Sequence, residues 1–190
     1  MKYIKNKLDE IMDFDMERDK EENIDLNIIN KIKNNSKISF SDDYLFYLSN
    51  YKTNYINDEY KYHNEKLNLE KIKDFEIDSL YGLLNNENYL ENKIQYYKNI
   101  IPDFLFPIGE LAGGDLICMD KTCGKVYLWI HDDENEKNYY MLNEGFFDFI
   151  DNIIHIPKSV ADDNLGIIES KVFISDKLDK FLKEGSKKYK

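Results

Sequence analysis

The chain has 190 residues and a mass of 22.7 kDa, which is about the length of one domain. Its 26 basic and 37 acidic side chains give a net charge of −11, which argues against a nucleic-acid binder, because such a protein needs positive charge. Mean hydropathy is −0.64, no apolar run is long enough to span a membrane, and the charged start does not resemble a signal peptide, so we expect a cytoplasmic protein without a membrane partner.

Three helices are predicted in the first fifty residues. The first covers residues 2–12 and places three apolar side chains on one face, those of Ile4, Leu8 and Ile11. A charged connector follows, and the second helix gathers isoleucines on one side, namely Ile24, Ile28, Ile29 and Ile32. The third begins after Ser41, a good N-cap, with Asp42 and Asp43 in its first turn, where the helix dipole favours carboxylates.

The middle of the chain has weaker patterns. Residues 50–66 are polar and are interpreted as a loop. Alternating apolar residues predict strands at 67–69 and 75–78. A helix is expected over 87–99, and the segment between Pro102 and Pro107 is interpreted as a loop.

The clearest pattern lies between Gly113 and Ile153. The Gly113–Gly114 pair permits a turn with positive φ, and a strand at 116–119 follows it. Residues 120–124 predict a hairpin loop, and the next strand, 126–130, is apolar on both faces, as in a covered strand. After an acidic turn come a strand at 139–142 and a helix with four apolar residues at helical spacing: Phe146, Phe149, Ile150 and Ile153.

The rest of the chain predicts a strand at 172–174 and a short helix over 175–185. The sequence contains no internal repeat, so we expect one domain over residues 1–190. Helices and strands occur in separate runs, which indicates an α+β fold. The expected architecture is an antiparallel or mixed β-meander of about four to six strands packed against several helices.

Five short segments together suggest a family. They are Ser41–Leu48, Phe106–Gly109, Gly113–Asp120, Gly124–Trp129 and Phe146–Ile150. Their order and spacing resemble the SUKH superfamily, which includes fungal cell-wall assembly (glucan synthesis) regulators and bacterial immunity proteins. The resemblance covers about residues 24–155. It leaves 1–23 as an N-terminal helical extension and 157–190 as a C-terminal extension with a basic tail, and the family's usual glycine turn after the early helix is missing at 50–55.

The resemblance implies a protein-binding module instead of an enzyme. Bacterial members of the superfamily include immunity proteins that block a cognate polymorphic toxin. The fungal branch is regulatory. The chain is therefore expected to neutralise a basic toxin domain by direct binding or, as the alternative, to act as a regulatory scaffold in cell-wall assembly. The resemblance brings no catalytic residues with it and sets no oligomeric state.

The residues offer few candidates for catalysis or for a bound group. Cys118 and Cys123 lack the spacing of a zinc knuckle, and Cys118 lies in an apolar strand, where a thiol is usually inert. The glycines at 109–114 open a strand and not a helix, so they do not predict a phosphate loop. The run 131–136 lacks the features of a calcium loop. We expect no catalytic residue, cofactor or metal, with a spatially assembled Cys–His pair as the open alternative.

Acidic charge is concentrated in the central segment. Residues 101–170 carry 4 basic and 14 acidic side chains, whereas residues 171–190 carry 7 and 3. Solubility is one interpretation of this excess, and steering of a basic partner is the other. We predict partner contacts in the acidic turn, by Asp132, Asp133, Glu134 and Glu136, and in second place by Asp42 and Asp43.

Overall fold

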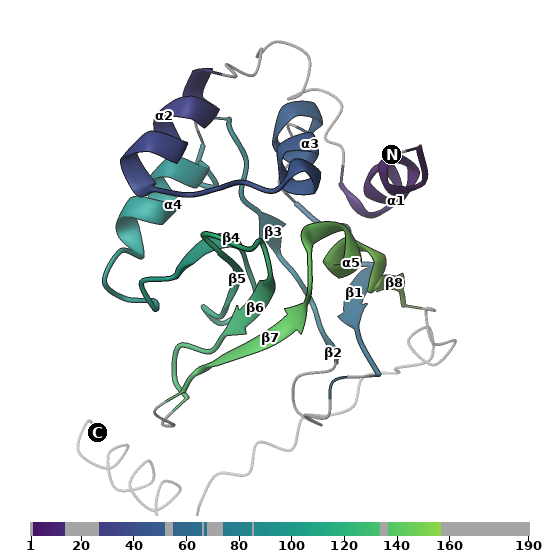
Figure 1. Ribbon diagram of the computed structural model, residues 1–190. Helices are drawn as coiled ribbons and strands as arrows, with labels where there is room; N and C mark the ends of the chain where they lie inside the picture. Colours follow the sequence, from purple (N-terminus) through teal and green to yellow (C-terminus); the bar gives the residue numbers. More distant parts are fainter. Residues whose placement is uncertain are drawn as a thin grey trace, which may run out of the picture. The chain divides into compact units, whose positions relative to one another are not determined.

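The computed structural model describes residues 2–13, 27–51, 55–65, 67, 74–84, 86–133 and 137–156, all of them within the compact unit Met1–Pro157. These residues form five helices and two antiparallel sheets, one of three strands and one of five (Figure 1). The predicted α+β class is therefore confirmed. The predicted charged connector from residue 14 on, and the strand at 172–174 with its following helix, lie outside the described residues.

The elements have the following bounds. The helices are α1 (Lys2–Ile11), α2 (Asn27–Ser36), α3 (Asp42–Asn50), α4 (Leu90–Tyr96) and α5 (Phe146–Asp151). The strands are β1 (Tyr60–His63), β2 (Asp74–Phe75), β3 (Ser79–Leu80), β4 (Leu105–Glu110), β5 (Leu116–Asp120), β6 (Val126–Trp129), β7 (Tyr139–Asn143) and β8 (Ile153–His155).

The larger sheet is a meander, as predicted, in the order β3-β4-β5-β6-β7. The β5–β6 hairpin turns at Gly124, which has a φ of +75°. In its loop the Asp120 carboxylate accepts hydrogen bonds from the backbone N–H groups of Thr122 and Cys123, at 2.7 and 2.9 Å. Partial burial acts to raise the pKa of Asp120, but these bonds hold it below its usual value. The loop is thus fixed by a carboxylate at its first position.

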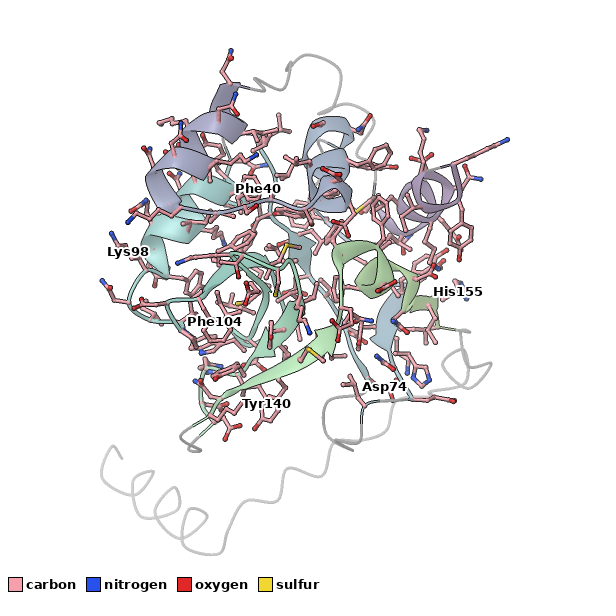
Figure 2. All side chains as sticks on the ribbon, in the orientation of Figure 1. Phe40, Asp74, Lys98, Phe104, Tyr140 and His155 are labelled. Atoms are coloured by element: carbon pink, nitrogen blue, oxygen red, sulfur yellow. The ribbon has the colours of Figure 1, made fainter. Side chains whose placement is uncertain are left out.

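The smaller sheet has the order β2-β1-β8. Its strands β1 and β2 are joined across the ladder by His63 and Asp74, whose Nδ1 and Oδ1 atoms lie 2.5 Å apart. The hydrogen bond from His63 lowers the pKa of the Asp74 carboxyl, and Lys61 adds to this effect. Figure 2 labels Asp74 and, on β8, His155, at the two outer strands of this sheet.

Three expectations from the sequence were wrong. Residues 50–66, predicted as a loop, contain β1, and the segment predicted as a loop up to Pro107 runs into β4. Pro107 fits within an interior strand because the β4–β5 register shifts between Pro107 and Gly109. Helix α5 ends at Asp151, so Ile153 begins β8 and does not extend the helix.

The main core lies between the helices and one face of the larger sheet. Tyr44 and Tyr47 of α3 are fully buried, and their rings lie 5.0 and 5.3 Å from that of Phe146 in α5. Phe40, which precedes α3, meets Phe106 of β4 edge to face at 5.7 Å (Figure 2). Aromatic pairs in these geometries add to the burial of apolar area, so this cluster fixes α3 and α5 against the sheet.

Helices α1 and α2 bury the faces expected of them. Both are short, and packing of the apolar face supplies most of the stability of such helices. The buried residues are Ile4, Leu8 and Ile11 in α1, and Ile29 and Ile32 in α2.

The opposite face of the larger sheet carries a smaller apolar cluster. Trp129 is 6% exposed there and packs with Cys118. Phe104 covers part of this face, with its ring 5.9 Å from that of Tyr127 and 5.2 Å from that of Tyr139. Phe104 itself is 38% exposed (Figure 2). This aromatic face is therefore less covered than the face that meets the helices.

Candidate functional site

The predicted acidic contacts after β6 lie in the turn between β6 and β7. Asp132 is exposed in that turn. Asp133 is half-buried, and its carboxylate accepts a hydrogen bond from the hydroxyl of Tyr140, labelled on β7 in Figure 2, at 2.5 Å. Glu134 and Glu136 lie outside the described residues. Of the two described carboxylates, Asp132 is the more accessible to a partner.

Asp43 connects the first turns of two helices. Its Oδ1 accepts the Tyr44 backbone N–H at 2.8 Å and the Ser41 hydroxyl, and its Oδ2 accepts the Phe147 backbone N–H of α5 at 3.0 Å. Ser41 occupies the predicted N-cap position, but its own side chain makes no capping bond. The neighbouring Asp42 is exposed. Asp43 therefore stabilises the packing of α3 and α5, and its contact with a partner stays a prediction.

The two predicted acidic groups do not form one patch. Asp132 and Asp133 precede β7, whereas Asp43 contacts Phe147, beyond the other end of that strand. Five residues of strand separate the two ends, which is about 17 Å. One small partner surface would therefore meet either the turn or the start of α3.

Asp115, His131 and Asp132 gather beside the same turn. The backbone N–H of His131 donates to Asp115 Oδ1 at 3.1 Å, and His131 Nδ1 lies 2.9 Å from the same oxygen. This hydrogen bond, with the charge of Asp132, raises the pKa of His131. One ligand atom from each of the three residues lies within 4.8 Å of the others, a set that could hold a divalent cation. The Asp115–His131 bond also accounts for the arrangement without an ion, because it ties the end of β6 to the start of β5.

A second acidic site lies around the strands β3 and β4, and we call it the acidic pocket. Its volume is about 360 Å³. Among the described residues, the lining includes no lysine or arginine and five carboxylates: Asp58, Glu76, Asp78, Glu87 and Glu110. The other lining residues are Tyr55, Ile56, Tyr60, Ile77, Ser79 and Asn88. A concave, carboxylate-rich surface of this kind suits a cation or a cationic side chain.

Pairing between strands assembles the acidic pocket. Ser79 of β3 lies opposite Glu110 of β4, and Tyr55 forms an isolated bridge with Ser79 on the other side. Glu76 and Asp78 are exposed while Ile77 is buried, but these three residues lie between β2 and β3, so the strand predicted over 75–78 was wrong beyond Phe75. The Asp78 backbone bonds to Glu110 at 3.0 Å and to Ile56 at 3.2 Å, whereas Asp58 and Glu87 lie in turns.

One carboxylate of the acidic pocket already has a cationic partner. Glu110 Oε2 accepts from Lys93 Nζ at 2.8 Å and from the Tyr81 hydroxyl at 2.7 Å. Burial and the bond to Glu110 raise the pKa of Tyr81, so its hydroxyl stays protonated as a donor. By contrast, Asp58, Glu76 and Asp78 form no ion pair with any described residue.

Two of the residues that line the acidic pocket, Asn88 and Ser79, have buried polar side chains. Asn88 and Ser79 are each 1% exposed. The Asn88 Oδ1 and Nδ2 atoms and the Ser79 Oγ atom have no hydrogen-bond partner among the described residues. Such groups cost about 1–3 kcal/mol each when they are left unsatisfied. Because these atoms have almost no accessible surface, a ligand in the pocket does not reach them in this arrangement.

A second cavity, of about 240 Å³, lies where α2 and α4 end. It has an apolar floor that includes Ile101 and Phe106, and Lys37 and Lys98 stand among its lining residues. None of the buried unpartnered polar atoms found in the described ranges belongs to its lining. The two cavities thus differ in charge, with carboxylates predominant in the acidic pocket and lysines in this one.

The thiols are in different environments. Cys118 is fully buried, and desolvation raises the pKa of its thiol well above the usual value, which disfavours the reactive thiolate. Cys123 is exposed in the β5–β6 loop. No hydrogen bond joins either sulfur to a histidine in the described ranges. The arrangement found thus lacks the Cys–His pair that was left open as a nucleophile.

Comparison with known proteins places these sites in a family. The family model described as "SMI1 / KNR4 family (SUKH-1)" matches residues 23–152. The chain belongs to the SMI1/KNR4 family. The predicted SUKH resemblance, which was expected over about residues 24–155, is thereby confirmed. The match contains α2 to α5, the whole acidic pocket and the β6–β7 turn, and it leaves out α1 and β8.

A curated relative of this SUKH-1 chain comes from Bacillus subtilis (strain 168). It is the "SPbeta prophage-derived uncharacterized protein YokK", 30% identical over 93 residues. The match covers 48% of this chain and 48% of the relative, so the chain spans about half the length of the relative it matches. No solved structure matches the chain. Among the described residues, no helix is both long and apolar enough to cross a membrane.

The sequence analysis missed the acidic pocket in this SUKH-1 domain. The alternation at 75–78 was detected, and it could have indicated that Glu76 and Asp78 are both exposed beside the buried Ile77. Asn88 gave no such signal, since an asparagine between polar residues is ordinarily exposed. The pocket also combines segments up to 55 residues apart, from Tyr55 to Glu110, which no local pattern relates.

Proposed function

We propose that this SUKH-1 protein is an immunity protein that neutralises a cognate bacterial toxin by direct binding. The observation that carries the proposal is the acidic pocket, where three of the lining carboxylates, Asp58, Glu76 and Asp78, form no ion pair with any described residue. A site of this kind fits a basic protein surface. Neutralisation needs no turnover, because the free energy of association alone keeps the toxin domain occupied.

Charge supports the proposal at longer range. The whole chain has a net charge of −11, and Asp132 adds an exposed carboxylate in the β6–β7 turn. The negative electrostatic field of such a protein raises its association rate with a basic partner and repels acidic proteins. Asp132 and Asp133, together with Glu134 and Glu136, are therefore proposed to steer the toxin, with Asp42 and Asp43 as contacts of second rank.

The relative in Bacillus subtilis is described as prophage-derived. We take this as support for a role in conflict between genetic elements. The resemblance noted in the sequence points the same way, because bacterial SUKH proteins include immunity proteins. The toxin itself is specified here only by its chemistry, as a domain with a basic surface.

Calorimetric titration against the product of a neighbouring toxin-like gene tests the proposal. The titration is run at about 0.03 M and about 0.3 M salt, because screening over this range weakens contacts between exposed charges. Tight binding that weakens at high salt is expected. Tight binding that is indifferent to salt would retain the immunity function and move the contact to an apolar surface such as the face around Phe104. No binding would contradict the proposed function.

A regulatory role is the second candidate, and the SUKH resemblance favours it because the fungal branch of that superfamily is regulatory. In that case the same acidic surface binds an endogenous partner of the cell-wall assembly machinery. A gene neighbourhood without a toxin, together with an endogenous protein that binds at comparable affinity in a purified system, would support regulation over immunity.

A further inference from the structure

We propose that the outer edge of β7 binds an extended segment of a protein partner, which joins the larger sheet as one more strand. Alternate side chains of that segment are apolar and cover the aromatic face, and its residues next to the β6–β7 turn are basic. The identity of that partner as a toxin rests on the proposed function, whereas the edge itself rests on the fold.

Strand β7 is the longest edge strand in the part of the chain that the structure describes. It lies at one end of the larger sheet (Figure 1). The other edge strands, β2, β3 and β8, have two or three residues each, and Tyr55 also pairs with β3. Proteins usually protect an edge with charge, with proline or by keeping the strand short. Strand β7 has five residues, none of them charged and none a proline, so its own sequence does not protect it.

The register with β6 shows which backbone groups of β7 are left over. The Ile130 N–H donates to the Asn138 carbonyl at 2.9 Å, and residue pairs of an antiparallel ladder are bonded and non-bonded in turn. Tyr139 and Met141 occupy the non-bonded positions, so their N–H and C=O groups point away from β6. Among the described residues these groups have no backbone partner. They can therefore pair with one further strand.

The far end of β7 is closed by the smaller sheet. Asn64, just after β1, donates from Nδ2 to the Leu142 carbonyl oxygen at 3.4 Å, and the Tyr62 hydroxyl donates to Asn143 Oδ1 at 2.9 Å. The open part of the edge is therefore Tyr139–Met141, which fits a short segment and not a whole sheet.

The side chains beside this open part favour apolar residues in the partner. Tyr139 and Met141 lie on the aromatic face together with Tyr127, their neighbour in β6. Met141 is 43% exposed, and the exposed ring of Phe104 lies 5.2 Å from that of Tyr139. A partner residue paired with Tyr139 or Met141 places its side chain on this same face. Apolar side chains at alternate positions would remove the exposed part of the face from water.

Charge at the start of β7 favours a basic segment over a second copy of this chain. Residues 131–138 contain four carboxylates and one lysine. That lysine, Lys137, lies over the Tyr139 ring at 5.1 Å, so this end of the aromatic face already accepts a cation. At the other end of the strand, Glu144 is paired with Lys125 at 2.8 Å. Two copies of the chain would each carry a net charge of −11, and their repulsion opposes pairing of β7 with itself.

Nuclear magnetic resonance of the full chain tests the edge without any toxin. The probe is a synthetic peptide in which valine and threonine alternate between pairs of lysines, KKVTVTVKK. We expect saturable binding that slows hydrogen exchange of the Tyr139 and Met141 amides by about tenfold or more. A peptide with glutamates in place of the lysines should bind about tenfold more weakly. No saturable binding of the lysine peptide, or shifts confined to the acidic pocket, would overturn the proposal.

Backbone methylation of the peptide shows whether strand pairing is involved. In the proposed pairing the valines pair with Tyr139 and Met141, so their N–H groups point toward β7, whereas the threonine N–H groups point away. Methylation of the valine nitrogens should therefore abolish saturable binding. Methylation of the threonine nitrogens is the matched control and should change the affinity by less than about threefold. Equal effects of the two modifications would overturn the pairing.

Variants of Met141 locate the site on the protein. Met141→Pro removes an outward N–H without removing a bond to β6, and proline is tolerated at such edge positions. Met141→Ala, the matched control, loses the same side chain and keeps the N–H. We expect the lysine peptide to bind the proline variant at least about fivefold more weakly than the alanine variant. Equal affinities in two variants with wild-type thermal midpoints would overturn the assignment, and if the proline variant unfolds, the methylated peptides decide the question.

The peptide and the toxin titrations separate the two proposals. If the lysine peptide binds at the edge and no toxin binds, the proposed function fails and the edge site stands. If a toxin binds tightly and the peptide does not, the edge site fails and the immunity function stands. Dimers in sedimentation of the free protein, with the Tyr139 and Met141 amides protected, would overturn the proposal in favour of a second copy of the chain.

Discussion

Removal of the Asp43 carboxylate should destabilise the fold far more than removal of its neighbour. In Asp43→Ala the backbone N–H groups of Tyr44 and Phe147 lose their acceptor, and α3 and α5 lose their direct polar link. A hydrogen bond to a charged group contributes about 1.5–3 kcal/mol, so two such bonds give at least about 3 kcal/mol. Access of water to the freed N–H groups offsets part of this, since Asp43 is half-buried. We expect a loss of about 2–4 kcal/mol in the free energy of unfolding.

Asp42→Ala is the matched control. The residue lies in the same helical turn, carries the same charge and is exposed, so its main contribution is to the helix dipole. That contribution is about 0.3–1 kcal/mol. Equilibrium unfolding in urea measures both variants, and with a slope of about 1–3 kcal/mol per molar the Asp43 variant should unfold at least about 0.7 M earlier than the wild type. Similar losses in the two variants, or a loss below about 1 kcal/mol for Asp43→Ala, would refute the proposed link between the helices.

Three further outcomes are expected. Asp115→Asn should lower the pKa of His131, which NMR titration measures. Because that pKa is raised in the folded state, the interaction stabilises the fold below the pKa of an unfolded histidine, and this stabilisation is lost as the pH rises through the folded value. The variant should therefore lose stability mainly at acid pH. A thiol reagent should modify exposed Cys123 quickly and buried Cys118 only on unfolding, as mass spectrometry of timed samples would show. Gly109→Ala should lower the thermal midpoint, because its Cβ would lie 2.6 Å from a carbonyl oxygen of β3; an unchanged midpoint would mean that β3 and β4 can separate without cost.

The sequence predicted those parts of the fold whose conformation is determined by residues close together in the chain. The β5–β6 hairpin follows from a glycine-containing loop between two apolar runs, and the Gly113–Gly114 turn indeed has both glycines at a φ of +98°. Helix α1 follows from isoleucine and leucine at helical spacing. In each case the local pattern and the tertiary packing favour the same structure, so the pattern alone was sufficient.

The parts that were missed depend on partners far away in the sequence. Strand β1 is a polar four-residue segment, and it becomes a strand because β2 and β8 pair with it on both sides. Pro107 indicated a loop, but a shift of register lets β4 accept it. The apolar residues up to Ile153 have helical spacing, but Ile153 pairs with β1 and therefore belongs to β8. Tertiary pairing overrode local propensity in all three segments.

The predicted and the observed acidic sites differ for the same reason. Counting carboxylates along the chain selects the β6–β7 turn, where they are adjacent in sequence and where Asp132 is solvated. In the acidic pocket, segments between Tyr55 and Glu110 that are distant in the sequence bring carboxylates together. Solvated charges raise the association rate but contribute little net affinity, whereas carboxylates gathered in a concave site can contact one cationic group together. If a basic partner uses both sites, substitutions at Asp132 should chiefly slow association, and substitutions at the acidic pocket should chiefly speed dissociation.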